Sequence, residues 1–211
     1  MSAPPAAAPP SQESLLEAAT REFMTAGFAG ARVDAIARRA KANKAMIYYH
    51  FGSKEGLYRA VLLRHFGGVL SEIERLVAEE PDPLRRLARI YAGIAHVLEE
   101  RPALAHIMVR EILAGGQHMA PEVRKTLTTI VGLVRRTIEE GVAKGALRPA
   151  DPWIVHLSMI APLLFHRLTA PVVARALPGV LAGVEPPSAD AMLAHLARVL
   201  ELSLAPDKES R

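Results

Sequence analysis

One short stretch of the sequence, residues 43–55, gathers side chains that can donate hydrogen bonds to an anion. It reads NKAMIYYHFGSKE and sets two tyrosines, a histidine and a phenylalanine side by side in a chain with only 5% aromatic residues. Tyrosine hydroxyls and a lysine ammonium donate to phosphate oxygens, and a small residue such as Ala45 lets a base or a thymine methyl group approach closely. The stretch therefore has the chemistry of a surface that contacts nucleic acid.

A helical period divides these side chains between two faces. Ile47 and Phe51 are four residues apart, so they share one face and are expected to pack inward. Lys44, Tyr48 and Tyr49 point away from that face, and exposed aromatic rings there favour a partner outside the fold. The alternative is a solvated helix face on which the two tyrosines cover neighbouring side chains.

The elements around this stretch are predicted to be short. Apolar residues recur at helical spacing over residues 33–40, KAN follows at residues 41–43, and Asn43 is a good N-cap for the next helix. An earlier helix is expected to begin after Ser11 and to end at Gly27. Two short helices joined by a tight turn are typical of the helix-turn-helix, in which the second helix enters the major groove of DNA.

The excess positive charge lies in the same part of the chain. The net charge is +4, and residues 1–65 hold nine Lys and Arg against five Asp and Glu, whereas residues 66–211 hold seventeen of each. This asymmetry is expected where one end of a chain meets a polyanion. A basic surface without a polyanionic partner gives the same count, so charge alone leaves both interpretations open.

The remaining sequence predicts further helices and no strand, so the expected fold is all-α with about nine helices. A long helix from Ser53 to about residue 79, on the order of 40 Å in length, is predicted to join the helix-turn-helix unit to a larger helical body. The later helices are expected over residues 83–101, 102–115, 121–145, 152–170 and 188–206, with the fourth of these disturbed by Pro162 and halted before Pro171.

These elements predict two domains and two tails. We expect a disordered tail over residues 1–10, a helix-turn-helix domain over residues 11–55, a helical body over residues 56–206 and a second tail over residues 207–211.

Composition excludes several classes of site. The chain has no cysteine, which excludes disulfides, thiolate zinc sites and cysteine nucleophiles. The longest apolar run, residues 154–165, contains a histidine and a proline and is too short to span a bilayer. The opening MSAPPAAAPPS lacks the basic start of a secretory signal. We therefore expect a cytoplasmic protein with no membrane partner.

Two predicted helices of the body are apolar on nearly every side, which indicates burial all round. In residues 103–113, His106 and Arg110 are four residues apart, and a buried arginine needs a partner, either in a structural ion pair or as the polar anchor of an effector pocket. The helix over residues 153–168 carries the only tryptophan, two histidines and a methionine. Core or dimer packing explains each of these alone, but together they suggest a mainly apolar small-molecule pocket. The candidate ligand-binding residues are His106, Arg110, Trp153, His156, Met159 and His166.

Residues 15–62 resemble the DNA-binding domain of TetR-family (AcrR-like) transcriptional regulators. GALRPADPW at residues 145–153 is also similar to the join that the family often has before its eighth helix. The residues that carry the resemblance in the first domain are Ala18, Phe23, Gly27, Phe28, Val33, Ile36, Ala37, Ala40, Lys44, Ile47, Tyr48, Tyr49, His50, Phe51, Ser53, Lys54, Glu55 and Leu57.

The resemblance implies roles for particular residues. Most DNA contacts should go to phosphates, with Ala45 and Met46 nearest the base edges and with Arg32 and Lys54 each clamping a phosphate. The family pairs its last two helices with their copies in a homodimer, for which the candidates here are Met192, Leu196, Val199 and Ser203. The residues expected at DNA are Arg32, Lys41, Asn43, Lys44, Ala45, Met46, Tyr48, Tyr49, His50 and Lys54.

The sequence departs from the family pattern at two places. Ala31 and Arg32 stand where the family often has Thr or Ser, so a helix cap and a phosphate contact are lost, although Arg32 can supply a longer one. Lys41, Ala42 and Asn43 stand where the family often has Gly-Val-Ser. Lys41 is then a non-glycine residue at a turn that favours a positive φ, at a cost of roughly 1 kcal/mol.

The resulting expectation is a homodimeric repressor that binds a palindromic operator and is released by a small, mainly apolar effector. A metal-responsive regulator is one alternative, because His106, His118, His156 and His166 could converge on folding even though no HxxxH or HExxH pair is present. An enzyme is a remote alternative, since no nucleophile elbow, phosphate-binding glycine loop or nucleotide motif appears. We expect no catalytic residue, no bound metal and no cofactor.

Overall fold

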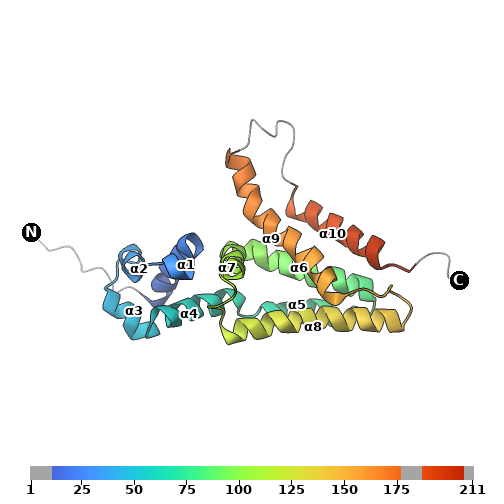
Figure 1. The fold of residues 1–211 in the computed structure, drawn as a ribbon, viewed down its shortest axis with the longest axis horizontal. Helices are drawn as coiled ribbons and strands as arrows, with labels where there is room; N and C mark the ends of the chain where they lie inside the picture. The colour runs from blue at the N-terminus through green and yellow to red at the C-terminus, as the bar shows by residue number, and fades with distance from the viewer. Residues whose placement is uncertain (1–10, 177–186, 207–211) are drawn as a thin grey trace, which may run out of the picture. The chain divides into compact units, whose positions relative to one another are not determined.

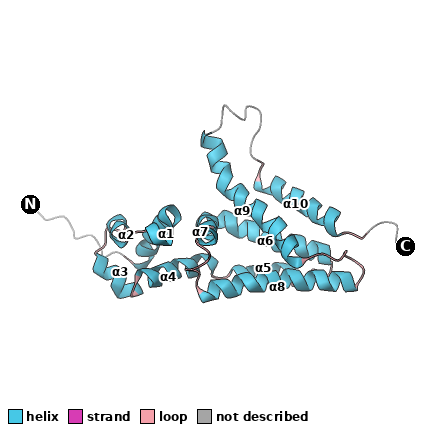
Figure 2. Ribbon diagram, in the orientation of Figure 1, coloured by secondary structure: helices cyan, strands magenta, loops and turns pink. Residues whose placement is uncertain are grey.

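A computed structural model of the chain describes residues 11–176 and 187–206. Within these two ranges the chain forms ten α-helices and no strand (Figures 1 and 2). The predicted all-α fold is therefore confirmed for the described residues. The tails expected over residues 1–10 and 207–211 lie outside the described ranges.

The chain divides into two compact units. Unit 1 holds the residues up to His65 together with His106–Pro121, and unit 2 holds Phe66–Ala105 and the residues from Glu122 onward. The expected boundary after residue 55 differs from this division, because the first unit extends ten residues further and takes in a segment from the middle of the expected body.

Unit 1 contains the three predicted short helices. They are α1 (Gln12–Gly30), α2 (Val33–Arg39) and α3 (Lys44–Phe51), and α4 (Lys54–Phe66) follows them. Helix α2 contacts both α1 and α3. The first four residues of α7 (Pro102–Leu113) belong to unit 2 and the rest belong to unit 1. The fully buried side chains of this core include Leu15, Phe23, Ile36, Ile47, Leu57, Leu62 and Ile107.

In unit 2, helix α6 (Pro83–Glu100) is central, because it contacts α5, α9 and α10 (Figure 1). Asp82 caps its first turn by accepting a hydrogen bond from the backbone N–H of Arg85 at 2.8 Å, which places Pro83 where its missing N–H costs nothing. The other helices of this unit are α5 (Val69–Val77), α8 (Pro121–Ala143), α9 (Pro152–Ala176) and α10 (Ala189–Leu204).

The single long helix predicted from Ser53 to about residue 79 is wrong. The chain forms α4 and α5 instead, separated at the glycine pair Gly67 and Gly68. Gly68 has a φ of 79°, a conformation that ends a right-handed helix and that glycine adopts without steric cost. The apolar spacing stays in phase on both sides of the pair, which is why periodicity alone indicated one helix.

Helix α9 is also longer than predicted, because it continues through Pro162 and Pro171 to Ala176. Each proline removes one backbone hydrogen bond, but the remaining bonds of the helix persist on both sides. By length and composition alone, Pro152–Arg175 could cross a membrane, with a mean hydropathy of 1.4 and 11% of the window buried. A helix with one apolar face for a protein partner meets the same criterion, so this finding is weak support for a membrane span.

The turn between α2 and α3 has the positive φ that the sequence predicts, with Lys41 at 52°. The backbone N–H of Lys41 donates to the carbonyl of Arg38 at 3.2 Å, and the N–H of Ala42 donates to the carbonyl of Ala37 at 2.9 Å. These two bonds form a Schellman motif, in which the left-handed position normally holds glycine.

Replacing Lys41 with glycine should therefore raise the free energy of unfolding by about 0.5–1 kcal/mol, because glycine adopts a positive φ without strain. Urea denaturation followed by circular dichroism measures this change. The Lys41→Ala variant is the control, since it removes the same charge but keeps the strained Cβ. Equal stability of the two variants would contradict the assignment of strain to this position.

Candidate DNA-binding surface and effector cleft

Helix α3 has one buried face and one exposed face. Ile47 is fully buried and Phe51 is half-buried, whereas the side chains of Tyr48 and Tyr49 are 43% and 84% exposed. The predicted inward position of Ile47 is confirmed. Because both tyrosine side chains are exposed, they are not core residues. The surface of α3 therefore offers two phenol hydroxyls and two aromatic rings to a partner.

The start of α3 is fixed by its cap. The side chain of Asn43 accepts a hydrogen bond from the backbone N–H of Ala45 at 3.0 Å, so Lys44 becomes the first residue of the helix. The Nζ atom of Lys44 lies 2.9 Å from an Oδ atom of Asp34, in the first turn of α2. The hydrogen bond that Lys44 donates to Asp34, together with the negative charge of Asp34, raises the pKa of Lys44 above the ordinary lysine value.

The other residues expected at DNA lie on unit 1 with two degrees of exposure. Lys54 is half-buried: its Nζ atom donates to the carbonyl of Ala29 at 3.4 Å and lies 4.8 Å from the ring centroid of Phe28. This lysine is thus held at the end of α1, and its ammonium keeps further N–H donors for a phosphate. Met46 is half-buried as well, and the exposed candidates are Arg32, Lys41, Asn43, Lys44, Ala45, Tyr48, Tyr49 and His50.

The sequence did not predict that residues 106–121 would belong to the unit that carries α3. Arg110 donates from Nε to the carbonyl of Met24 at 2.6 Å and from Nη2 to the carbonyl of Thr25. These carbonyls precede Gly27, whose φ of 68° and ψ of −179° break the helical bonding of α1. Arg110 is exposed and forms neither the ion pair nor the effector anchor that the sequence suggested; its guanidinium satisfies carbonyls at the break in α1.

Glu111, next to this arginine, is a buried carboxylate that is only 2% exposed. One of its oxygens accepts a hydrogen bond from the hydroxyl of Tyr58 at 2.6 Å, and Nδ1 of His118 lies 4.0 Å from the same oxygen. The second oxygen has no hydrogen-bond partner in the described part of the chain. Burial and the neighbouring carboxylate both raise the pKa of Tyr58, so its hydroxyl remains a donor. The ring of His118 stacks on Phe28 with centroids 4.0 Å apart.

The Tyr58→Phe variant should lose about 2–3 kcal/mol of unfolding free energy, because it leaves a buried carboxylate without its donor. Thermal or urea unfolding measures the loss. Tyr91→Phe is a matched control: Tyr91 is equally buried, but its hydroxyl is 3.4 Å from Nδ1 of His156, so about 1 kcal/mol or less is expected. Equal losses in both variants would contradict a special role for the bond to Glu111.

The effector candidates of unit 2 lie in different surroundings. Met159 is buried in the core, and Trp153 is 58% exposed, with its ring centroid 6.0 Å from that of His156. His156 is half-buried beside Tyr91, and burial lowers its pKa below the ordinary histidine value. His106 is half-buried and belongs to unit 1 with Arg110.

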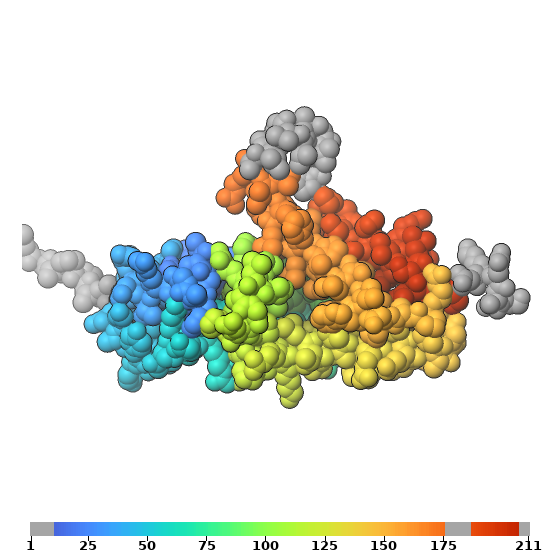
Figure 3. Space-filling model, in the orientation of Figure 1, coloured from blue at the N-terminus to red at the C-terminus, as the bar shows by residue number. Residues whose placement is uncertain are grey.

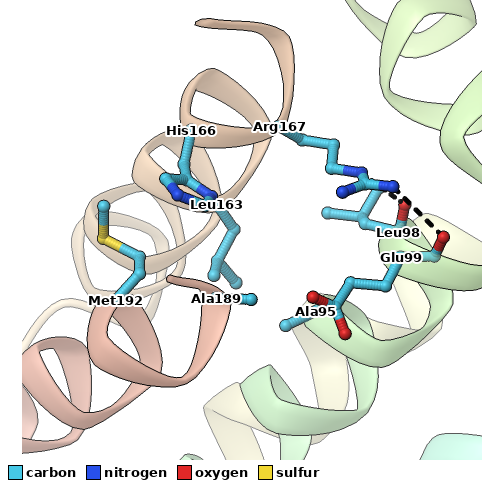
Figure 4. A pocket seen from close by; sticks show the side chains of 8 residues that line it. All are labelled: Ala95, Leu98, Glu99, Leu163, His166, Arg167, Ala189 and Met192. Carbon is cyan, nitrogen blue, oxygen red and sulfur yellow. Dashed lines mark hydrogen bonds between the residues drawn. The ribbon is translucent and has the colours of Figure 1, made fainter. Parts of the chain in front are cut away.

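One cleft in unit 2 includes His166 and lies among α6, α9 and α10 (Figure 4). Its neighbour Arg167 donates to the carbonyls of Leu98 and Glu99 at 3.1 and 3.2 Å, as the dashed lines in Figure 4 show, and so caps the end of α6. The cavity volume is about 20 Å³, which is enough for a single water molecule. The lining side chains are Ala95, Leu98, Glu99, Leu163, His166, Arg167, Ala189 and Met192.

Comparison with known protein families accounts for both units. Residues 15–61 match the family described as bacterial regulatory proteins, tetR family. Residues 83–201, more than half of the chain, match the tetracyclin repressor-like, C-terminal domain. The chain belongs to the TetR family. It is therefore a DNA-binding transcriptional regulator of the ligand-responsive type, as the resemblance of residues 15–62 predicts.

Individual relatives agree with this assignment. The chain is 34% identical over 157 residues to the HTH-type transcriptional repressor NicS of Pseudomonas putida, covering 73% of this chain and 74% of that protein. The ketosteroid transcriptional regulator KstR2 of Mycobacterium tuberculosis has the same fold, with a TM-score of 0.72, 19% identity and coverage of 92% and 95%. The regulator FadR of Bacillus subtilis, solved with stearoyl-CoA, gives a TM-score of 0.61 at 17% identity, covering 91% and 97%.

The described residues of this TetR-family chain do not support the metal-responsive alternative. Of the four histidines considered, His106 and His118 lie in unit 1 and His156 and His166 in unit 2. The one group of three metal-ligand side chains found among the described residues contains none of them: it comprises Glu72, His96 and Glu100, with Nε2 of the histidine 3.8 and 3.4 Å from the two carboxylates.

The apolar residues that unit 2 leaves exposed lie mainly on α9. Figure 3 shows the orange surface of α9 facing the viewer, uncovered by the other helices of its unit. The exposed large apolar side chains of α9, each between 50% and 68% exposed, are Trp153, Ile154, Leu157, Phe165 and Val172.

Helix α10 carries the residues predicted for the dimer face. Leu196 is buried within its own unit, and its place at a dimer interface stays a prediction. Met192 and Val199 are half-buried and Ser203 is exposed. Leu202, which the sequence did not single out, is 68% exposed on the same helix.

Proposed function

We propose that this TetR-family regulator is a homodimeric repressor that binds a palindromic operator and is released by a small, mainly apolar effector. The observation that carries the proposal is the division of α3. Its buried Ile47 anchors the helix to unit 1, while Lys44, Tyr48 and Tyr49 stand exposed with the donors that phosphates accept.

The exposed apolar side chains of α9 support the homodimer. Five large apolar residues on one helix, each at least half exposed, form a patch of the kind that marks a protein interface. A two-fold dimer places two recognition helices about 34 Å apart, which matches one turn of B-DNA and so favours a palindromic site.

The cleft among α6, α9 and α10 supports the effector part of the proposal. Alanine, leucine and methionine side chains form most of its lining, and Glu99, His166 and Arg167 supply polar groups at its edge. A volume of about 20 Å³ is far below the several hundred that a small ligand fills, so effector binding must open the cleft. Helix α7 has residues in both units, and its Arg110 donates to two carbonyls of α1, so we infer that α7 transmits such a change to the helix-turn-helix.

We further infer that the protein acts in the cytoplasm, where it has access to the chromosome, and that it acts by binding and not by catalysis. This inference follows from the family, whose members are regulators that contact DNA.

The test is a selection of DNA duplexes from a randomised library by the full chain, followed by sequencing and sedimentation of the complex. We expect a two-fold symmetric sequence bound by two protomers. A panel of small apolar compounds, screened by thermal shift, should contain some that raise the melting temperature and release the selected duplex. A selection that returns no preferred sequence would refute the proposed function.

A further inference from the structure

The two short helices of the basic helix-turn-helix, α2 and α3, carry one acidic residue, Asp34, and the nearest others in sequence are Glu22 and Glu55. Between residues 23 and 54 the only Asp or Glu is Asp34. The surrounding residues carry six positive charges, at Arg32, Arg38, Arg39, Lys41, Lys44 and Lys54. A surface that served only to attract phosphates would gain from having no carboxylate here, so the position of this one is informative.

The carboxylate of Asp34 is paired with the lysine that begins the recognition helix. Its Oδ1 atom lies 2.9 Å from Nζ of Lys44, and the two side chains are 73% and 46% exposed. The contact joins the first turn of α2 to the first residue of α3 across the turn of the motif. Since the pair is on the surface, its contribution to folding stability is small. We expect it to act mainly on the binding of DNA at this surface.

We propose that Asp34 is a specificity-determining residue, which neutralises Lys44 toward DNA of arbitrary sequence and positions its ammonium group for the operator. The inference rests on the proposed function, in which Lys44 contacts the operator.

Binding to arbitrary DNA depends on the number of phosphates that the protein neutralises. With Asp34 in contact, Lys44 brings almost no net charge to a passing phosphate, and the free oxygen of the carboxylate repels it. The pair therefore weakens attachment to DNA that offers nothing but its backbone.

Binding to the operator uses Lys44 differently, because the recognition helix is then seated at one register. A lysine side chain has many rotamers, and ordering it on binding costs affinity. The hydrogen bond that Lys44 donates to Asp34 holds the ammonium in one place before DNA arrives, so this ordering is already achieved in the free protein. The carboxylate therefore lowers the affinity for all DNA. On the operator alone, the preordered ammonium of Lys44 restores part of the lost affinity.

The test compares full-length wild-type protein with Asp34→Asn, which removes the charge and keeps the shape. Two duplexes of equal length serve as probes: one of random sequence and one selected from a randomised library by the wild-type chain. We expect Asp34→Asn to raise affinity for the random duplex about threefold to tenfold at 0.1 M salt, and to steepen the slope of log K against log salt by about 0.9 for each protomer bound. Affinity for the selected duplex should change by less than twofold.

Glu17→Gln is the matched control, because it removes one exposed carboxylate of the same unit, on α1, away from Lys44. It should leave the ratio of the two affinities unchanged. In a Lys44→Ala background, Asp34→Asn should lose most of its effect on the random duplex, because the pair no longer exists.

The outcomes separate this inference from the proposed function. If a preferred duplex is selected but Asp34→Asn shifts both affinities equally, or shifts neither, the inference is overturned and the proposed function stands. If no duplex is preferred, the proposed function fails and the specificity role fails with it.

Discussion

Replacing Lys44 and Tyr48 together with alanine should reduce operator affinity by roughly a hundredfold to a thousandfold. Each side chain is exposed on α3 and offers one donor to phosphate, and a homodimer loses four such contacts at once. A net contribution of about 1 kcal/mol for each contact gives a loss of this size. Because one ammonium disappears from each protomer, the slope of log K against log salt should also fall by about two.

Fluorescence anisotropy with the selected duplex, at several salt concentrations, measures both quantities. The loss should be smaller on duplexes of other sequence, because Asp34 already neutralises Lys44 toward such DNA and mainly the Tyr48 contact is lost there. Arg75→Ala controls for net charge, because it removes an exposed cation from α5 in unit 2. Unchanged operator binding in the Lys44 and Tyr48 variant would remove α3 from the DNA-binding surface.

The faces of α3 could be predicted from sequence because both are decided locally. A period of 3.6 residues places Ile47 opposite the exposed tyrosines, and the Asn43 cap sets where that period begins. The positive φ of Lys41 could be predicted from the family resemblance instead, because the family often has glycine at this position and glycine is favoured in a left-handed turn.

The contacts of Arg110 could not be predicted in this way. Its partner carbonyls on Met24 and Thr25 lie 86 and 85 residues earlier in the chain. Periodicity indicates that a side chain is on one face of a helix, but it does not indicate which distant backbone lacks a donor. The break at Gly27, which creates that need, is itself a local feature that could have suggested a search for a donor.

Burial within a protomer and burial between protomers give the same sequence pattern, which is why the sequence offered Leu196 as a candidate for the dimer face although its own unit buries it. An apolar residue at helical spacing is expected to be covered, and the sequence does not say by what. Leu196 is buried by its own unit, whereas the side chain of Phe165 on α9 is 68% exposed. Only the fold separates the two.

That separation makes α9 the place to test assembly. Changing both Leu157 and Phe165 to glutamate should convert the dimer to a monomer, because two large apolar side chains, each worth about 1.5–3 kcal/mol when covered, become charges that an apolar interface cannot accept. Operator affinity should then fall by more than about a hundredfold, since each monomer holds only one half-site. Analytical ultracentrifugation and anisotropy measure the two effects.

The folded state of the protomer should survive these changes, because Leu157 and Phe165 are 50% and 68% exposed before any partner binds. Circular dichroism should therefore show unaltered helix content. Leu113→Glu provides a control with equal change in chemistry, since Leu113 is 82% exposed but lies on α7 in unit 1. A dimer that persists in the α9 variant would place the interface elsewhere. A monomer that still binds the selected duplex with full affinity would show instead that one protomer suffices, and the requirement for a palindromic operator would fall.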